Sequence, residues 1–331
     1  LAVTYREKNE NGDFVGGPMY YIKNGLNKNW RWMAGLFAFF GMFAAFGIGN
    51  MVQSNSVADE MFTTFKIPFW LTGMVMSLCV SIVIIGGVKR IAKVASKLIP
   101  FMAIIYVFAA LIIVLINYDK IPSVVMLIIQ SAFNGAAASG GFLGASVWMA
   151  IRMGFARGIF SNEAGLGSGP IAHAAAKTNN PVNQGMIAML GVFVDTIIIC
   201  SLTAFVILLT GAFESGHKGA SMTSLAFSTG LYGYGGYIVS FGLILFAFTT
   251  ILGWSYYGER CASYLFGIKI IFLYRFFWII ATFIGAVIKL ELVWIFADIA
   301  NGLMALPNLI ALLLLSPVIF IKTKHYFNRH S

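Results

Sequence analysis

The sequence predicts an all-α polytopic membrane protein. Of its 331 residues, 59% are hydrophobic and 10% are charged, whereas a soluble domain carries roughly 25% charged residues. The mean hydropathy is +0.85, and apolar segments long enough to cross a bilayer recur along the chain. The formal charge of +10 does not indicate nucleic-acid binding, because the basic residues stand in short loops between apolar segments.

The N-terminal residues 1–31 are expected to lie outside the bilayer. Leu1 is not a start methionine and no signal peptide follows it, so we expect further residues upstream. Residues 18–31 place aromatic rings beside basic residues, which is typical of a segment anchored at a membrane surface.

Eight spans follow from the apolar runs. The stretch GGVKRIAKVASK at 86–97 is read as a loop, and PIAHAAAK at 170–177 is read as a short helix. Gly302 and Pro307 predict a kink in the last span. The spans are placed at 32–57, 69–86, 99–116, 122–156, 182–213, 237–257, 270–288 and 292–321.

The fourth span is interrupted near its centre by NGAAASGG at 134–141. A helix broken inside lipid leaves backbone groups without partners, so such breaks are tolerated where they are buried or line a watery cavity, as in transporters. The alternative is that small residues only allow two helices to pack closely.

The distribution of Lys and Arg predicts the orientation. With both ends in the cytoplasm, 18 of the 22 basic residues fall on the cytoplasmic side, which is a strong positive-inside signal. The other four are Lys66, Lys120, Lys218 and Lys289.

Several polar residues are expected at membrane depth. Asn50, Gln53 and Ser54 share one helix face, where they either join helices or bind a ligand. Asp195 and Asp298 are the acidic residues well inside spans, and each is either a cation site or a neutralised carboxyl bonded to a neighbouring helix.

Two hydroxyls of the sixth span, Thr249 and Thr250, suit sodium, although back-bonding within the helix would also explain them. His173 is read as structural, and Glu163 as a cytoplasmic cap or gate residue. The three cysteines, Cys79, Cys200 and Cys261, predict neither disulfides nor a metal site.

The motifs do not indicate an enzyme. GLGSG at 165–169 is not a phosphate-binding loop, because no Gly-Lys-Ser/Thr follows it. The sequence contains neither HExxH nor GxSxG.

Several segments, spread over nearly the whole chain, closely resemble the alanine or glycine:cation symporters, also called sodium:alanine symporters. The principal one is GFARGIFSNEAGLGSGPIAHAAA at 154–176. The others are YREKNENGDFVGGPMYYI at 5–22, FGIGNMVQSNSVA at 46–58, GGVKRIAKVASKLIPFMA at 86–103, FAFTTILGWSYYGER at 246–260 and ADIANGLMALPNLIALL at 297–313.

The resemblance implies the LeuT-like fold of two five-helix inverted repeats with discontinuous first and sixth helices. The eight spans are then core helices three to ten, because the first two core helices of the family have no match here. Residues 32–121 complete the first repeat, 122–321 form the second, 1–31 are cytoplasmic or interfacial, and 322–331 form a cytoplasmic tail.

The resemblance also implies site residues. Sodium is expected at Thr249, Thr250 and the carbonyl of Phe246, and an extracellular gate at Asp298 and Asn301. The substrate is expected beside Asn50, Gln53, Phe133, Asn134, Gly140, Gly141 and Trp254.

The implied activity is sodium-coupled symport of a small neutral amino acid, alanine or glycine, into the cell across the plasma membrane. The expected partners are the amino acid, Na⁺ as coupling ion and the lipid bilayer, with no other cofactor and no nucleic acid. A proton-coupled or facilitative transporter, a passive channel and a transporter-like amino-acid sensor remain alternatives.

Overall fold

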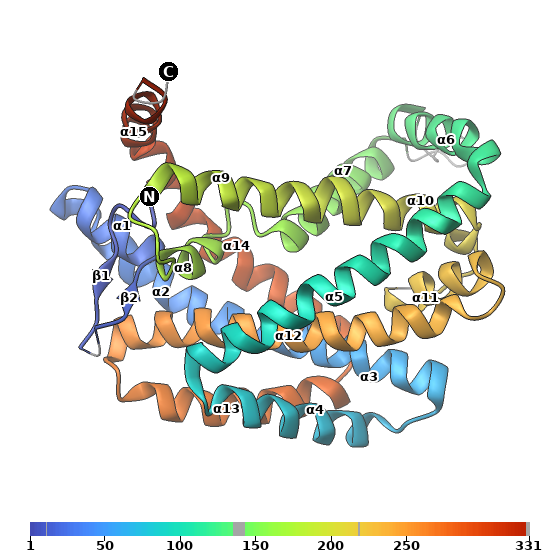
Figure 1. The fold of residues 1–331 in the computed structure, drawn as a ribbon, viewed down its shortest axis with the longest axis horizontal. Helices are drawn as coiled ribbons and strands as arrows, with labels where there is room; N and C mark the ends of the chain where they lie inside the picture. The colour runs from blue at the N-terminus through green and yellow to red at the C-terminus, as the bar shows by residue number, and fades with distance from the viewer. Residues whose placement is uncertain (11, 135–142, 218, 329–331) are drawn as a thin grey trace.

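The computed structural model describes residues 1–10, 12–134, 143–217 and 219–328. It is a bundle of helices with a small antiparallel hairpin at the N-terminal end (Figure 1). The hairpin consists of β1 (Glu7–Lys8) and β2 (Phe14–Val15). The helices of the first half are α1 (Pro18–Gly25), η1 (Lys28–Trp30), α2 (Trp32–Ala44), η2 (Ala45–Met51), α3 (Val52–Phe65), α4 (Phe69–Ile84), α5 (Gly87–Ile116), η3 (Tyr118–Lys120), α6 (Ile121–Asn134) and α7 (Leu143–Asn162).

The second half contains a further set of helices in the same bundle. They are α8 (Gly169–Ala174), α9 (Pro181–Val192), η5 (Phe193–Cys200), α10 (Ser201–Leu209), η6 (Ala212–Glu214), α11 (Ala220–Gly230), α12 (Gly235–Phe266), α13 (Ile270–Val287), α14 (Leu290–Leu314) and α15 (Ser316–Asn328).

Within the described residues, six helical segments are long and apolar enough to cross a membrane. They correspond to six of the eight expected spans, and the second span is the shorter apolar helix Phe69–Ile84. The fourth span is represented by α6 and α7, and its predicted break lies outside the described residues. The chain is therefore a multi-pass membrane protein. The total of eight membrane spans stays a prediction. The six segments are Lys28–Phe65, Gly87–Ile116, Pro181–Leu209, Gly235–Phe266, Ile270–Val287 and Val293–Leu314.

The prediction of a loop at 86–97 is wrong, because α5 begins at Gly87 and contains the rest of this segment. Lys89, Lys93 and Lys97 recur every four residues and so lie along one face, while Ile91 is buried on another. The basic residues therefore belong to an amphipathic helix. The predicted short helix at 170–177 is confirmed as α8.

The last span also differs from its prediction. Its helix ends at Leu314, and a separate helix, α15, begins at Ser316 just before Pro317. Pro307 lies inside α14, which continues through it.

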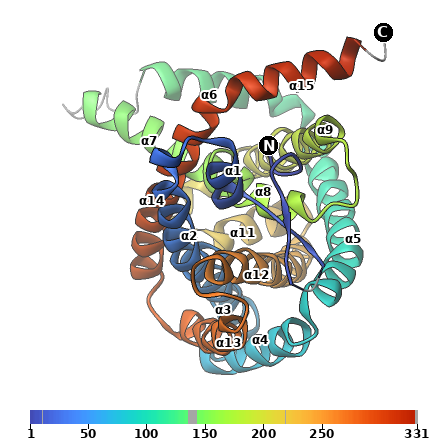
Figure 2. The same ribbon diagram turned by 90° about the vertical axis from the view of Figure 1, so that its left-hand side faces the viewer.

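The centre of the bundle is α12, which contacts α2, α3, α5, α11 and α13 (Figures 1 and 2). The main core contains three fully buried side chains around this centre, Ile251 of α12, Trp278 of α13 and Phe37 of α2. A second apolar cluster forms around Ile113 and Phe227, where α5, α10 and α11 meet.

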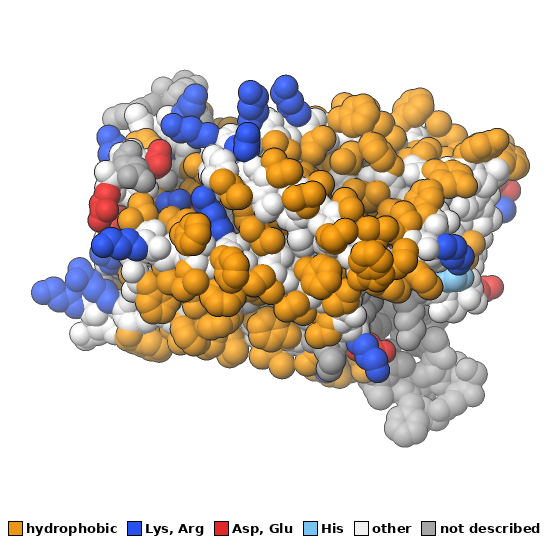
Figure 3. Space-filling model, turned by 90° about the horizontal axis from the view of Figure 1, so that it is seen from below, with side chains coloured by type: hydrophobic (Ala, Val, Ile, Leu, Met, Phe, Trp, Pro, Cys, Tyr) orange, Lys and Arg blue, Asp and Glu red, His pale blue; other side chains and the backbone are white. Residues whose placement is uncertain are grey.

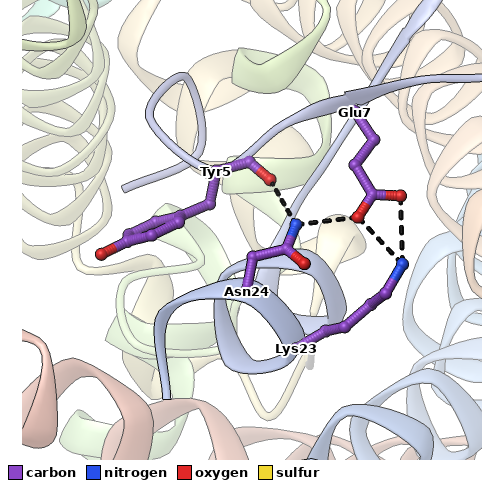
Figure 4. Close-up of polar contacts among 4 residues, drawn as sticks. All are labelled: Tyr5, Glu7, Lys23 and Asn24. Atoms are coloured by element: carbon purple, nitrogen blue, oxygen red, sulfur yellow. Dashed lines mark hydrogen bonds and ion pairs between the residues drawn. The ribbon is translucent and has the colours of Figure 1, made fainter. Parts of the chain in front are cut away.

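The N-terminal residues pack against the bundle. Tyr21 of α1 is buried and donates a hydrogen bond to Asn308 Oδ1 of α14. Glu7 of the hairpin accepts two bonds from Lys23 and one from Asn24, whose amide also reaches the Tyr5 carbonyl (Figure 4). The exposed tryptophans Trp30 and Trp32 lie after α1, and the interfacial position of residues 18–31 stays a prediction.

The surface is apolar over most of one face. Figure 3 shows hydrophobic side chains along the face seen from below in Figure 1, where α4 and α13 lie, with Lys and Arg gathered toward one end. Leu78 and Ile82 of α4 and Phe276 of α13 are exposed. Such an extended apolar surface is expected to contact lipid.

Candidate substrate and cation site

Two spans contain wide, π-helical turns, which are frequent at functional sites. The first, η2, carries Asn50, and the second, η5, carries Asp195. Both residues were expected at membrane depth on the basis of the sequence. The Gln53 amide of α3 donates to the Ile48 carbonyl of η2 at 3.1 Å, so this half-buried side chain supports the local backbone.

Asn50 faces α13 in this structure. Its side chain is fully buried, and its amide nitrogen donates to the Trp278 carbonyl at 2.9 Å. Its Oδ1 atom is buried and has no hydrogen-bond partner among the residues that the structure describes. Asn50 thus joins two helices and keeps one acceptor free.

Helix η2 packs tightly against α12 at Gly49. A Cβ atom added at Gly49 would lie 2.1 Å from the Cβ of Trp254. Only a glycine allows this approach, so the sequence Gly47-Ile48-Gly49 brings the Asn50 segment against Trp254.

Trp254 is joined to Glu163. The indole Nε1 donates to Glu163 Oε1 at 2.8 Å, and the Ser168 hydroxyl donates to Oε2 at 2.7 Å. Burial raises the pKa of Glu163, and the bonds from Ser168 and Trp254 act in the opposite direction. Glu163 also has a φ of 56°, which is uncommon for a residue other than glycine and is found at functional sites.

A cavity of about 420 Å³ lies beside this bond. Its wall is formed by the end of α7, the α7–α8 connection and α8, together with α1, α9, η5, α12 and α14. The polar residues that line it include Ser161, Asn162, Glu163, Asp195, His173 and Asn308.

Asp195 is held by neighbouring hydroxyls. The Ser161 hydroxyl contacts both carboxylate oxygens, at 3.0 and 2.9 Å, and Thr196 donates at 3.2 Å. This is the second of the two alternatives raised for Asp195, a carboxyl bonded to a neighbouring helix.

The three expected sodium ligands lie together on α12. Thr249 is buried, and its hydroxyl donates to the carbonyls of Leu245 and Phe246 at 2.9 and 3.0 Å. Thr250 is half-buried beside it. Back-bonding therefore accounts for Thr249 here, while the oxygens of Thr249 and Phe246 remain adjacent.

The expected gate residues lie on α14. Asp298 forms an ion pair with Arg157 of α7 at 2.6 Å, and the Arg157 guanidinium stands 4.2 Å from the centroid of the Trp294 ring. Asn301 is buried, and its Oδ1 has no partner. Because Arg157 was assigned to the cytoplasmic side, a gate on the extracellular side does not fit its pairing with Asp298.

The remaining predicted residues cannot be placed in the site. Phe133 and Asn134 are the last residues of α6, and Gly140 and Gly141 lie outside the described residues.

The sequence missed the role of Glu163. It was read as a cap or gate residue and not as a partner of Trp254, because 91 residues separate the two in the sequence. The available signal was an acidic residue in a segment rich in small residues, SNEAGLGSG at 161–169.

Comparisons with known proteins agree with the resemblance. A model described as the sodium:alanine symporter family matches residues 1–331. The sodium/alanine symporter AgcS of Methanococcus maripaludis is 47% identical over 98% of this chain and 72% of its own. An uncharacterized transporter of Haemophilus influenzae is 54% identical over 99% of this chain and 72% of its own. The probable sodium/glutamine symporter GlnT of Bacillus subtilis is 40% identical over 98% of this chain and 67% of its own.

Proposed function

Because the chain belongs to the sodium:alanine symporter family, we propose that it couples the entry of sodium to the uptake of a small neutral amino acid, alanine or glycine. The family consists of multi-pass membrane transporters, so the chain is a transporter and not an enzyme. We further propose that it adopts the LeuT-like inverted-repeat fold and lies in the plasma membrane with both described ends in the cytoplasm.

The observation that carries this proposal is the contact of Trp254 with both Gly49 and Glu163. In this arrangement Asn50 of η2 lies on one side of Trp254, and the cavity beside Glu163 lies on the other. We assign Asn50, Gln53 and Trp254 to the substrate side, with Phe133, Asn134, Gly140 and Gly141 contributed by the break. The bond from Trp254 to Glu163 then separates that side from the cavity.

The sodium assignment rests on Thr249, Thr250 and the Phe246 carbonyl, because hard oxygen ligands suit Na⁺. We place Asp298 and Asn301 in a latch between α14 and α7, which is a revision of the extracellular gate. A potential of 100 mV supplies about 2.3 kcal/mol per sodium charge, and tenfold accumulation of substrate needs about 1.4 kcal/mol. One sodium ion per amino acid is therefore sufficient.

Purified protein in proteoliposomes is expected to accumulate labelled alanine when an inward sodium gradient is imposed. Equalising sodium should abolish the accumulation, and glycine and glutamine added in excess should rank the competing substrates. Accumulation driven equally by a proton gradient without sodium would indicate the proton-coupled alternative. Uptake that only equilibrates would indicate a facilitator or channel, and binding without uptake would indicate a sensor.

The closure assigned to Trp254 and Glu163 predicts a non-additive pair of variants. Trp254→Phe and Glu163→Gln each weaken the same charge-assisted hydrogen bond, which is worth about 1.5–3 kcal/mol. Each variant should lower steady-state alanine accumulation, and the double variant should be little worse than either single variant. Trp70→Phe, which changes an exposed tryptophan of α4 and leaves this bond intact, is the matched control. Fully additive losses would contradict the closure.

A further inference from the structure

Glu60 is a buried carboxyl that neither the substrate side nor the cavity uses. It lies on α3, five residues before the helix ends at Phe65, and its exposure is 0%. The helix belongs to the long apolar segment Lys28–Phe65. A buried ionisable residue in a membrane segment is costly and is therefore a candidate functional site.

Hydroxyl groups surround one oxygen of Glu60. Oε1 accepts a bond from the Thr64 hydroxyl at 2.8 Å and is also hydrogen-bonded to the Ser240 hydroxyl of α12. The Ser240 hydroxyl also contacts the Gly236 carbonyl at 2.9 Å. Because a serine hydroxyl has a single hydrogen, it cannot fully satisfy both acceptors at once.

Among the described residues, the other oxygen, Oε2, is buried with no hydrogen-bond partner. An ionised carboxylate would thus place negative charge on an oxygen that accepts no hydrogen bond from them. A bound cation near Glu60 would offset the cost of that charge.

The protein supplies no such charge within the described residues, where the ion pairs join Lys23 to Glu7, Arg157 to Asp298 and Arg275 to Glu259. Beside Glu60 on its own helix is Asp59, which adds negative charge.

The surrounding helices do not replace the missing cation. Lys66, at the end of α3, donates to the Thr63 carbonyl and stands 5.8 Å from the centroid of the Phe62 ring. From α12, the Tyr237 ring packs against Phe65. From α11, the hydroxyls of Ser224 and Ser228 lie against Gly236. The helices α3, α11 and α12 contact one another (Figure 1).

We propose that Glu60, Ser240 and Thr64 form a binding site for a monovalent cation, H⁺ or Na⁺. The cation neutralises the carboxylate and fastens α3 to α12. A proton would sit between Glu60 and Ser240 and free the Ser240 hydrogen for the Gly236 carbonyl. Sodium would take the carboxylate and hydroxyl oxygens as hard ligands.

This site is distinct from the sodium residues assigned above. Ser240 precedes Thr249 by nine positions on one helix, which is roughly 14 Å at 1.5 Å per residue. The inference does not depend on transport, so it can be tested apart from the proposed function.

The test measures the thermal stability of the purified protein as sodium replaces choline and, separately, as pH is varied without sodium. The wild type is expected to be stabilised by one of the two cations, because binding to the folded state raises stability. Glu60→Gln, a neutral side chain of the same shape, should remove the part of that response that comes from Glu60 and leave the sodium response expected at Thr249 and Thr250. A smaller sodium response in this variant identifies a sodium site at Glu60, and a smaller pH response identifies a proton site.

Two further variants keep the test decisive. Asp119→Asn removes an exposed carboxyl on η3 and should leave the response intact. Ser240→Ala keeps the charge and should weaken the apparent affinity for the cation roughly tenfold or more. The proposal would be overturned if a folded Glu60→Gln protein responded to sodium and to pH like the wild type. If Glu60→Gln does not fold, the same result with Ser240→Ala would overturn it.

Discussion

Replacing Arg275 by Met is expected to lower the free energy of unfolding by about 3–5 kcal/mol, because the change leaves a buried carboxylate without its partner. Arg275 of α13 holds Glu259 of α12 through two bonds, Nε to Oε1 at 2.6 Å and Nη2 to Oε2 at 2.9 Å. The side chain of Glu259 is 1% exposed and that of Arg275 is 22% exposed. This bidentate pair joins the central helix to its neighbour.

The double variant Glu259→Leu with Arg275→Met separates the loss of the ion pair from the cost of leaving a buried charge without a partner. Replacing a whole buried pair by apolar side chains is often close to neutral, so the double variant should recover most of the lost stability. Unfolding in mixed micelles, followed by tryptophan fluorescence, gives the comparison. If Arg275→Met is as stable as the wild type, the buried carboxyl of Glu259 does not need Arg275 for the stability of the fold, and the prediction is wrong.

The sequence predicts the membrane class and most helix positions because these depend on runs of apolar residues. It fails where a polar pattern has two structural meanings. The basic segment at 86–97 was read as a loop, but its four-residue period also fits a helix whose basic face is exposed while Ile91 is buried. Charge content alone does not separate these two possibilities.

The candidate site is less predictable because its contacts join residues far apart in the sequence. Trp254 was expected near the substrate on family resemblance, but its partner Glu163 lies on another segment and was assigned a different role. Arg157 and Asp298 were likewise placed at different depths and form a pair. A single sequence carries no information on which helices pack together, so these pairings come only from the fold.

Replacing Gly49 by Ala is expected to reduce alanine uptake strongly, by about 10- to 100-fold, while the protein stays folded. The new Cβ would lie 2.1 Å from the Cβ and 2.2 Å from the Cγ of Trp254. These atoms form the base of the indole side chain, so they cannot move without shifting the backbone of α12 or η2. Overpacking of this kind costs about 1–3 kcal/mol, and every 1.4 kcal/mol corresponds to tenfold.

Gly35→Ala and Gly253→Ala are the matched controls, because a Cβ at either position meets nothing within 4 Å. Gly35 lies in the same long segment as Gly49, and Gly253 is next to Trp254 on α12. Both controls should retain uptake, which would attribute the Gly49→Ala defect to the displaced indole and its bond to Glu163. Wild-type uptake by Gly49→Ala, with unchanged tryptophan fluorescence, would show that the close approach of η2 to Trp254 is not needed for transport. Since Asn50 directly follows Gly49, that result would also remove the argument that this contact aligns Asn50 with the substrate side.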